Sequence, residues 1–140
     1  MISLSKDVLR AMLKDAEMRY PEECCGIIFG RINDSKTAEY AEAVNNAYDK
    51  AEKYHRFEIT PEIMLKAELT ARKKGFDIIG FYHSHPDCEA FPSEFDRTHA
   101  FPVYSYIIIS VVKGEEFRTR SFVLSAEDNQ FSEEKVYFKE

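Results

Sequence analysis

The sequence predicts an α/β fold, in which one domain is built on a mixed, mostly antiparallel β-sheet flanked by helices. Segments with helical periodicity alternate with short segments of apolar, β-branched or alternating residues. From residue 24 the order is strand, strand, helix, strand, and later strands follow short turns, which favours a mixed sheet over a doubly wound one. With 140 residues the chain can build one core but hardly two, so we take residues 1–140 as a single domain.

The N-terminal elements follow from an apolar stripe and from turn residues. Residues 5–19 are predicted to be a helix, because apolar side chains recur at helical spacing and Pro21 prevents continuation. Strands are predicted over residues 24–32 and 39–44, joined by an Asn-Asp-Ser turn. Residues 45–55 are polar and irregular, and loops of that length are often functional.

The middle of the chain predicts a second helix and a buried strand. Thr60 is the expected helix cap and Pro61 the first helical residue. The helix should run to residue 74, where basic side chains suit the helix dipole and Gly75 can end it. Residues 76–82 are apolar, β-branched or aromatic, and therefore predict a short buried strand.

The C-terminal half predicts one short helix and three strands. A loop over residues 86–92 leads to a helix over residues 93–100. Residues 104–112 are strongly apolar and predict a buried strand, which a Lys-Gly-Glu turn connects to a strand over residues 116–124. A last strand is predicted over residues 133–138.

Two histidines at the end of the predicted strand 76–82 are candidate metal ligands. Alternate residues of a strand face the same side, so His83 and His85 should converge, while Ser84 points the other way and should pack or form a hydrogen bond. Ser93 and Asp96 should share one face of the short helix, where Asp96 can supply a third ligand. Three ligands leave a fourth tetrahedral position for water, as in catalytic zinc sites.

Each half of this pattern also has a purely structural interpretation. Ser-x-x-Asp at a helix start is a capping box, in which Ser93 and Asp96 satisfy backbone N–H groups. Histidines in proteins often only complete hydrogen bonds, so His-x-His alone is weak evidence for a metal.

The complete pattern resembles the signature of the JAMM (MPN+, Jab1-Pad1-MPN) metalloproteases. It consists of His83-Ser84-His85, the spacing to Ser93, and Ser-x-x-Asp ending at Asp96. Residues 20–30, which include Tyr-Pro-Glu-Glu-Cys-Cys-Gly, are similar to the N-terminal block of that family. The resemblance covers most of the chain and, without long insertions, is nearest to the small stand-alone prokaryotic type. It implies an MPN/JAMM fold, which is cytidine-deaminase-like.

The resemblance also implies roles for individual residues. It places a bound Zn²⁺ on His83, His85 and Asp96, and it makes Glu23 the group that carries the proton of the attacking water. Spacing alone does not choose Glu23 over its neighbour Glu22. Ser93 would donate a hydrogen bond to the oxyanion.

The implied activity is that of a zinc-dependent metallo(iso)peptidase. Such an enzyme would hydrolyse the amide bond after the C-terminal glycines of a ubiquitin-like or sulfur-carrier protein. We expect a Gly-Gly tail to reach the metal as an extended strand, between residues 45–57 on one side and the loop 86–92 on the other. The alternatives are a non-catalytic MPN-type scaffold, a hydrolase of another small amide, and a structural zinc module. Neither the particular carrier nor the oligomeric state follows from the sequence.

Composition excludes several other classes of function. The net charge of -6 argues against a nucleic-acid partner, and no apolar run reaches membrane-spanning length. We expect a cytoplasmic protein, because the N-terminus does not resemble a signal peptide.

Three cysteines argue against a disulfide framework, and Cys88 is interpreted as a bystander. His99 is interpreted as solvent-exposed, with a role behind Asp96 as the alternative.

Overall fold

A computed structural model describes residues 1–45 and 59–139 of the chain. Within these residues the protein forms three helices and eight strands. The helices are α1 (Lys6–Arg19), α2 (Pro61–Lys74) and α3 (Glu94–Thr98). The strands are β1 (Ile2–Leu4), β2 (Cys25–Ile32), β3 (Lys36–Val44), β4 (Asp77–Pro86), β5 (Ser105–Val112), β6 (Glu116–Leu124), β7 (Phe131–Glu134) and β8 (Val136–Phe138).

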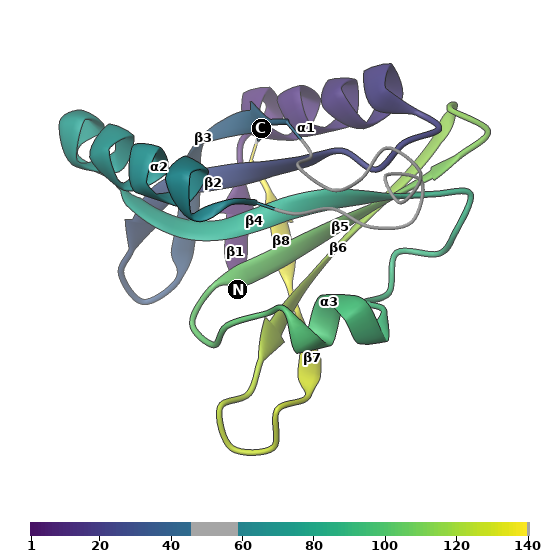
Figure 1. Ribbon diagram of the computed structural model, residues 1–140. Helices are drawn as coiled ribbons and strands as arrows, with labels where there is room; N and C mark the ends of the chain where they lie inside the picture. The colour runs from purple at the N-terminus through teal and green to yellow at the C-terminus, as the bar shows by residue number, and fades with distance from the viewer. Residues whose placement is uncertain (46–58, 140) are drawn as a thin grey trace.

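All the strands belong to one sheet, in the order β7-β6-β5-β4-β2-β3-β1-β8 (Figure 1). Neighbours are antiparallel except for β4 with β5 and β1 with its two partners, β3 and β8. The predicted mixed, mostly antiparallel sheet is therefore confirmed. Strand β4 lies near the middle of the strand order, between β2 and β5. Its backbone is therefore held by hydrogen bonds along both edges.

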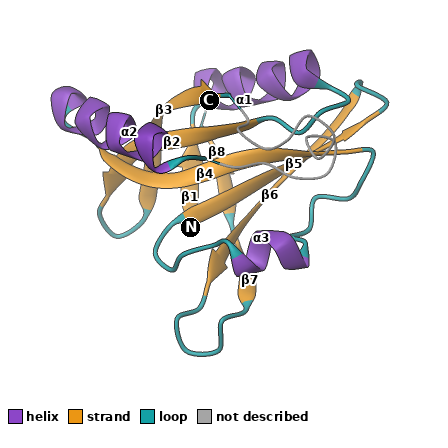
Figure 2. Ribbon diagram, in the orientation of Figure 1, coloured by secondary structure: helices purple, strands orange, loops and turns teal. Residues whose placement is uncertain are grey.

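Helices α1 and α2 cover opposite faces of this sheet. The buried face of α1 packs against Ile28 of β2, whereas α2 packs against the flanking residues Ile27 and Phe29 of the same strand. Since neighbouring residues of a strand face opposite sides, the two helices lie on different faces. Figure 2 shows α1 above the strands and α3 below them.

The caps of the two long helices match their sequence signals. The Oγ of Ser5 accepts a hydrogen bond from the Val8 N–H, and Thr60 caps α2 in the same way through the Ile63 N–H. Gly75 ends α2 at φ 75°, a left-handed conformation that glycine adopts without the usual steric cost.

Two predictions for the chain ends and connections need correction, and one strand was missed. The single strand predicted over residues 133–138 is wrong: β7 pairs with β6 and β8 pairs with β1, at opposite ends of the strand order. Lys135 lies between them, and its carbonyl accepts a hydrogen bond from the Ile2 N–H at 3.1 Å. Nothing in the local sequence pattern of residues 133–138 reveals this change of partner. Strand β1 was not predicted, because three residues are too few to show a period. Helix α3 ends at Thr98, before the predicted residue 100.

The predicted loop over residues 45–55 lies outside the described residues, apart from Asn45. None of the described helices is long and apolar enough to cross a membrane. All three cysteines are free thiols, with Cys24 and Cys25 buried and Cys88 exposed.

Candidate metal centre

Strand β4 brings the two histidines to the end of the sheet on the face covered by α2. Backbone pairing sets His83 beside Cys25 of β2 and Ile108 of β5, so the strand is fixed from both sides. The His83 side chain is 1% exposed and that of His85 is 12% exposed. Both rings therefore face one another in a largely water-free environment, with their Nε2 atoms 3.2 Å apart.

Helix α3 supplies the carboxylate, and it does so through the capping box. The Ser93 N–H donates to Asp96 Oδ2 at 2.8 Å, and the Asp96 N–H donates to Ser93 Oγ at 3.1 Å. The same Oδ2 lies 3.3 Å from His83 Nε2 and 3.2 Å from His85 Nε2. The capping and ligand interpretations therefore describe the same side chains, because the cap orients the oxygen that faces the histidines.

These three atoms have the spacing of ligands around a tetrahedral zinc ion. Ligand atoms about 2.0–2.1 Å from zinc at tetrahedral angles lie about 3.3 Å from each other. The observed triangle of two Nε2 atoms and one carboxylate oxygen has sides of 3.2, 3.2 and 3.3 Å. Two imidazoles and one carboxylate form a donor set that suits zinc, so the residues present fit the metal that the family resemblance implies.

A backbone carbonyl fixes the orientation of His85. Its Nδ1 lies 3.0 Å from the carbonyl oxygen of Glu89, which can only accept, so Nδ1 carries the donated proton. The neutral ring then has its lone pair on Nε2, the atom that faces Asp96. Such an outer hydrogen-bond partner is typical of metal-binding histidines.

Burial and charge bias the protonation of the three groups. Burial lowers the pKa of His83, although the Asp96 carboxylate opposes this effect. Burial would also lower the pKa of His85, but the hydrogen bond and charge of Asp96 outweigh it and raise that pKa. For Asp96, burial raises the pKa, but the neighbouring histidines outweigh it and hold the pKa well below its usual range. The Asp96 carboxylate is therefore ionised.

Glu23 lies beside the histidines, just before β2 begins. It is 2% exposed, and its carboxylate and the ring nitrogens of His83 and His85 all lie within 4.8 Å of one another. The Asp96 Oδ2 atom lies 3.3 Å and 3.2 Å from the Nε2 atoms of the two histidines, so the carboxylates of Asp96 and Glu23 are both candidates for the third ligand position. Burial raises the Glu23 pKa to about 8, with His85 lowering it and Asp96 raising it further. Glu22 is only half-buried.

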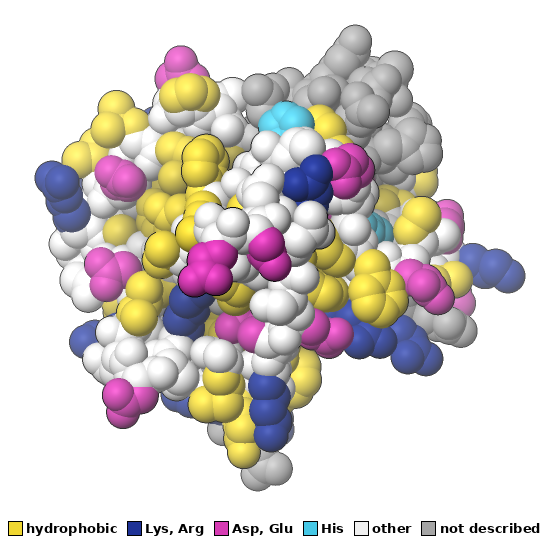
Figure 3. Space-filling model, turned by 90° about the horizontal axis from the view of Figure 1, so that it is seen from below, with side chains coloured by type: hydrophobic (Ala, Val, Ile, Leu, Met, Phe, Trp, Pro, Cys, Tyr) yellow, Lys and Arg dark blue, Asp and Glu magenta, His cyan; other side chains and the backbone are white. Residues whose placement is uncertain are grey.

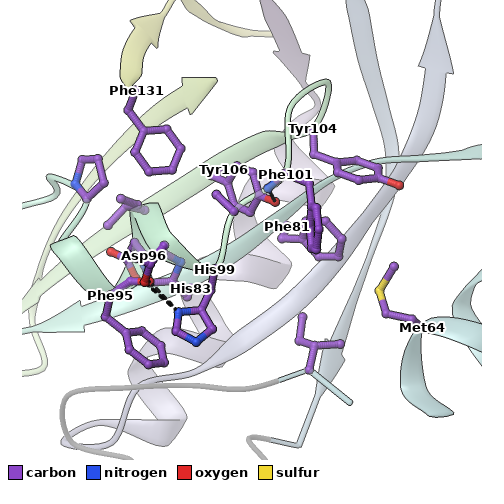
Figure 4. Close-up of a pocket in the computed structure, with 15 residues that line it drawn as sticks. Met64, Phe81, His83, Phe95, Asp96, His99, Phe101, Tyr104, Tyr106 and Phe131 are labelled. Carbon is purple, nitrogen blue, oxygen red and sulfur yellow. Dashed lines mark hydrogen bonds and ion pairs between the residues drawn. The ribbon is translucent and has the colours of Figure 1, made fainter. Parts of the chain in front are cut away.

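A pocket of about 650 Å³ opens directly from this centre (Figure 4). His83 and Asp96 form one side of it, and Met64 lies on the opposite side. Six of the fifteen described residues that line it carry phenyl or phenol rings, namely Phe81, Phe95, Phe101, Tyr104, Tyr106 and Phe131. Among the described residues that line the pocket, none is a lysine, an arginine or a glutamate. Figure 3 views this side of the molecule, where hydrophobic side chains lie between charged ones.

The structure also places the remaining residues singled out in the sequence. Ser93 is exposed, with its Oγ accepting the capping hydrogen bond. Ser84 is fully buried and forms a hydrogen bond with the Cys24 backbone, as predicted. His99 is exposed and stacks on Phe95, with ring centroids 4.0 Å apart, at the pocket wall.

Sequence reasoning missed the aromatic pocket and two residues that flank the centre, Tyr20 and Asp87. The available signal for the pocket was the density of aromatic residues between positions 95 and 106. No local pattern could pair Tyr20 with Asp87, because they lie 67 positions apart in the sequence.

Known proteins have sequences similar to this chain. Residues 5–125 match the model of the prokaryotic homologs of the JAB domain. Desampylase of Haloferax volcanii is 37% identical over 91 residues, a match that covers 64% of this chain and 63% of that protein. Desampylase of Pyrococcus furiosus is 30% identical over 130 residues, covering 91% of this chain and 84% of that protein.

A solved structure extends the similarity over the whole fold. The solution structure of a protein from Desulfitobacterium hafniense superposes with a TM-score of 0.88 at 34% identity, and covers 100% of this chain and 94% of that one. Since the family match spans residues 5–125, it includes Glu23, both histidines, Ser93 and Asp96. The chain therefore belongs to the prokaryotic homologs of the JAB domain, a small member of the JAMM type.

Proposed function

We propose that this protein is a zinc-dependent metallo(iso)peptidase that cleaves the amide bond after the C-terminal glycines of a ubiquitin-like or sulfur-carrier protein. The observation that carries the proposal is the ligand triangle of His83, His85 and Asp96, with the buried carboxylate of Glu23 beside it. Two relatives named Desampylase support a hydrolase with a ubiquitin-like substrate.

Each residue of the centre has chemistry that suits one step of amide hydrolysis. When bound, zinc would polarise the scissile carbonyl and make a water molecule acidic near neutral pH. Glu23 accepts the proton of the attacking water and delivers it to the leaving amine, for which a carboxylate with a pKa of about 8 is well suited. The Ser93 hydroxyl donates a hydrogen bond to the developing oxyanion while its Oγ still accepts one from the Asp96 N–H.

The substrate would approach as an extended chain. Two glycines fit beside the crowded ligand residues, where a larger side chain would collide with the rings. Of the walls predicted for this tail, residues 46–57 lie outside the described residues, and the loop 86–92 borders the centre through Glu89. The aromatic pocket adds a third wall, and an apolar side chain upstream of the glycines would be desolvated there favourably.

The central test compares two carriers. Zinc-loaded enzyme is offered a small carrier domain fused through its terminal Gly-Gly to an amino acid or short peptide, beside an otherwise identical carrier ending in Ala-Ala. Cleavage of the first alone is the expected result. Equal cleavage of both would refute the glycine-tail channel, whereas cleavage of neither would favour a hydrolase of another small amide or a non-catalytic scaffold.

The pocket wall has its own test, with a matched control in the same loop. Phe101 and Val103 are 66% and 67% exposed, but only Phe101 lines the pocket. Phe101→Ala should raise the KM for the carrier roughly fivefold, as expected for about 1 kcal/mol of lost apolar contact. Val103→Ala should leave KM unchanged, and an equal effect of both variants would show that the pocket does not hold the tail.

We further propose that residues 1–140 carry this activity as one domain. The protein expressed from this sequence alone should bind one zinc per chain and cleave the Gly-Gly carrier without any added factor.

A further inference from the structure

The segment that carries Glu23 is tied at both ends to the strand end that carries the ligands. Glu23 lies between Tyr20 and Cys24, and these two residues contact Asp87 and Ser84 respectively. Ser84 lies between the two histidines, and Asp87 follows His85 by two positions. These two contacts lie on either side of Glu23 in the sequence and limit how far its carboxylate can move relative to the two histidines.

The inner tie is a pair of buried hydrogen bonds. The Cys24 N–H donates to Ser84 Oγ at 2.8 Å, and the Ser84 N–H donates to the Cys24 carbonyl at 3.1 Å. Both residues are fully buried. The pairing of β2 with β4 ends at Cys25 and His83, so these bonds extend the connection one residue beyond it, to the neighbour of Glu23.

The outer tie joins Tyr20, after the end of α1, to the loop that follows His85. The Tyr20 hydroxyl donates to Asp87 Oδ2 at 2.6 Å, while the other carboxylate oxygen accepts the Lys113 N–H at 2.7 Å. The Asp87 N–H donates to the Val111 carbonyl at 2.7 Å. Asp87 is therefore held against the turn between β5 and β6, and it in turn holds Tyr20.

We propose that Tyr20 and Asp87 are positioning residues that, together with Ser84, hold Glu23 at its working distance from the metal centre. The outer tie is not needed to dock α1, whose apolar face is already buried against the sheet through Val8 and Met12. Only three residues separate Tyr20 from Cys24, and one of them is Pro21. The backbone between the two hydrogen-bonded residues therefore has little conformational freedom. This inference rests on the proposed function, in which Glu23 carries the proton.

The test removes one hydroxyl at the surface. Tyr20→Phe keeps the ring but loses the bond to Asp87, and it should lower kcat roughly tenfold, since small misplacements of a catalytic group are costly. The zinc content and KM should stay at the wild-type values, because neither the ligands nor the pocket is touched. Tyr137→Phe, at an exposed position in β8, is the matched control and should leave kcat unchanged.

The Asp87 side of the tie is tested by a pair of variants. Asp87→Asn keeps an oxygen for the Lys113 N–H, offers an amide to the Tyr20 oxygen, and tolerates the left-handed backbone at φ 55°. It should therefore retain most of the wild-type kcat, whereas Asp87→Ala should match Tyr20→Phe. The double variant Tyr20→Phe/Asp87→Ala should be no worse than either single variant, because the two residues act as one unit.

A second measurement does not depend on turnover. In zinc-loaded protein, amide hydrogen exchange of Cys24 should be about tenfold faster in Tyr20→Phe than in wild type, because the segment opens more often. An unchanged kcat per bound zinc in Tyr20→Phe, with or without a lower Tm, would overturn the proposal. If the wild-type enzyme cleaves no carrier, the proposed function fails, and Cys24 exchange alone decides whether Tyr20 holds this segment.

Discussion

The two halves of the candidate metal centre are built in different ways. His83 and His85 lie on β4, which is paired on both sides within the eight-stranded sheet and is buried along most of its length. Asp96 lies on α3, a helix of five residues in which Asp96 is the buried residue. The sheet holds the first half by a ladder of backbone hydrogen bonds, whereas a capping box holds the second.

Because of this difference, the two halves should not depend equally on the metal for their stability. A five-residue helix is far too short to be stable on its own, so α3 depends on its cap and on contacts such as that of Arg97 with the Asn129 carbonyl. A bound zinc would link β4 to α3, and we expect it to stabilise α3 more than β4. The predictions below test this contrast, beginning with the largest expected effect.

Removing a ligand from either half should abolish zinc binding and with it all hydrolysis. His83→Ala and Asp96→Ala should each weaken zinc affinity by more than about 100-fold, the upper range for losing an outer partner. The halves should differ in Tm, since His83→Ala also empties a fully buried site in the sheet, while Asp96→Ala loosens only α3. Metal analysis and thermal unfolding measure both effects, and stoichiometric zinc in both variants would refute the ligand assignment.

The next largest effect should come from Glu23, which lies just before β2 and which we propose as the base rather than as a ligand. Glu23→Gln keeps the size of the side chain but removes the base, so zinc should stay bound while kcat falls by about 10²–10⁴-fold. Glu22→Gln is the matched control, because Glu22 is half-buried in the bend before β2 and its carboxylate is not part of the described cluster of Glu23 with the two histidines. The reverse outcome would shift the assignment by one residue.

Ser93 tests whether the α3 half takes part in chemistry or only in capping. Ser93→Ala should lower kcat by about 100-fold with zinc retained, the cost of removing one oxyanion donor. It should also lower the stability by about 1 kcal/mol through loss of the cap. A lower Tm with unchanged kcat would leave capping as its only function.

The burial of Glu23 predicts a pH dependence in the metal-free protein. Its pKa is raised in the folded state from 4.5 to about 8, so its favourable contribution is complete below pH 4.5 and is lost as the pH rises through 8. Relative to wild type, metal-free Glu23→Gln should therefore gain roughly 2–4 kcal/mol of unfolding free energy between pH 4.5 and pH 9. Urea unfolding of both proteins across this range measures the difference, and parallel curves would contradict the raised pKa.

Local signals predicted the parts of the molecule that depend on neighbouring residues. The cap of α2 and the strands β2 to β6 follow from side-chain period and from turn residues. The convergence of His83 with His85 follows from the two-residue period of a strand, and the closeness of Ser93 to Asp96 follows from the first turn of a helix. The role of Glu23 came only from the family resemblance and stays a prediction.

By itself, then, the sequence determined most of the elements and the two local pairs, His83 with His85 and Ser93 with Asp96, because these depend on residues a few positions apart. Only the tertiary structure decided how distant segments meet. It brought Asp96 to the two histidines to form one triangle of candidate ligand atoms. It also set Tyr20 against Asp87 across 67 positions and Cys24 against Ser84 across 60. It also divided the last strand between the two ends of the sheet. Such contacts depend on how the sheet pairs and twists, and no local period in the chain records that.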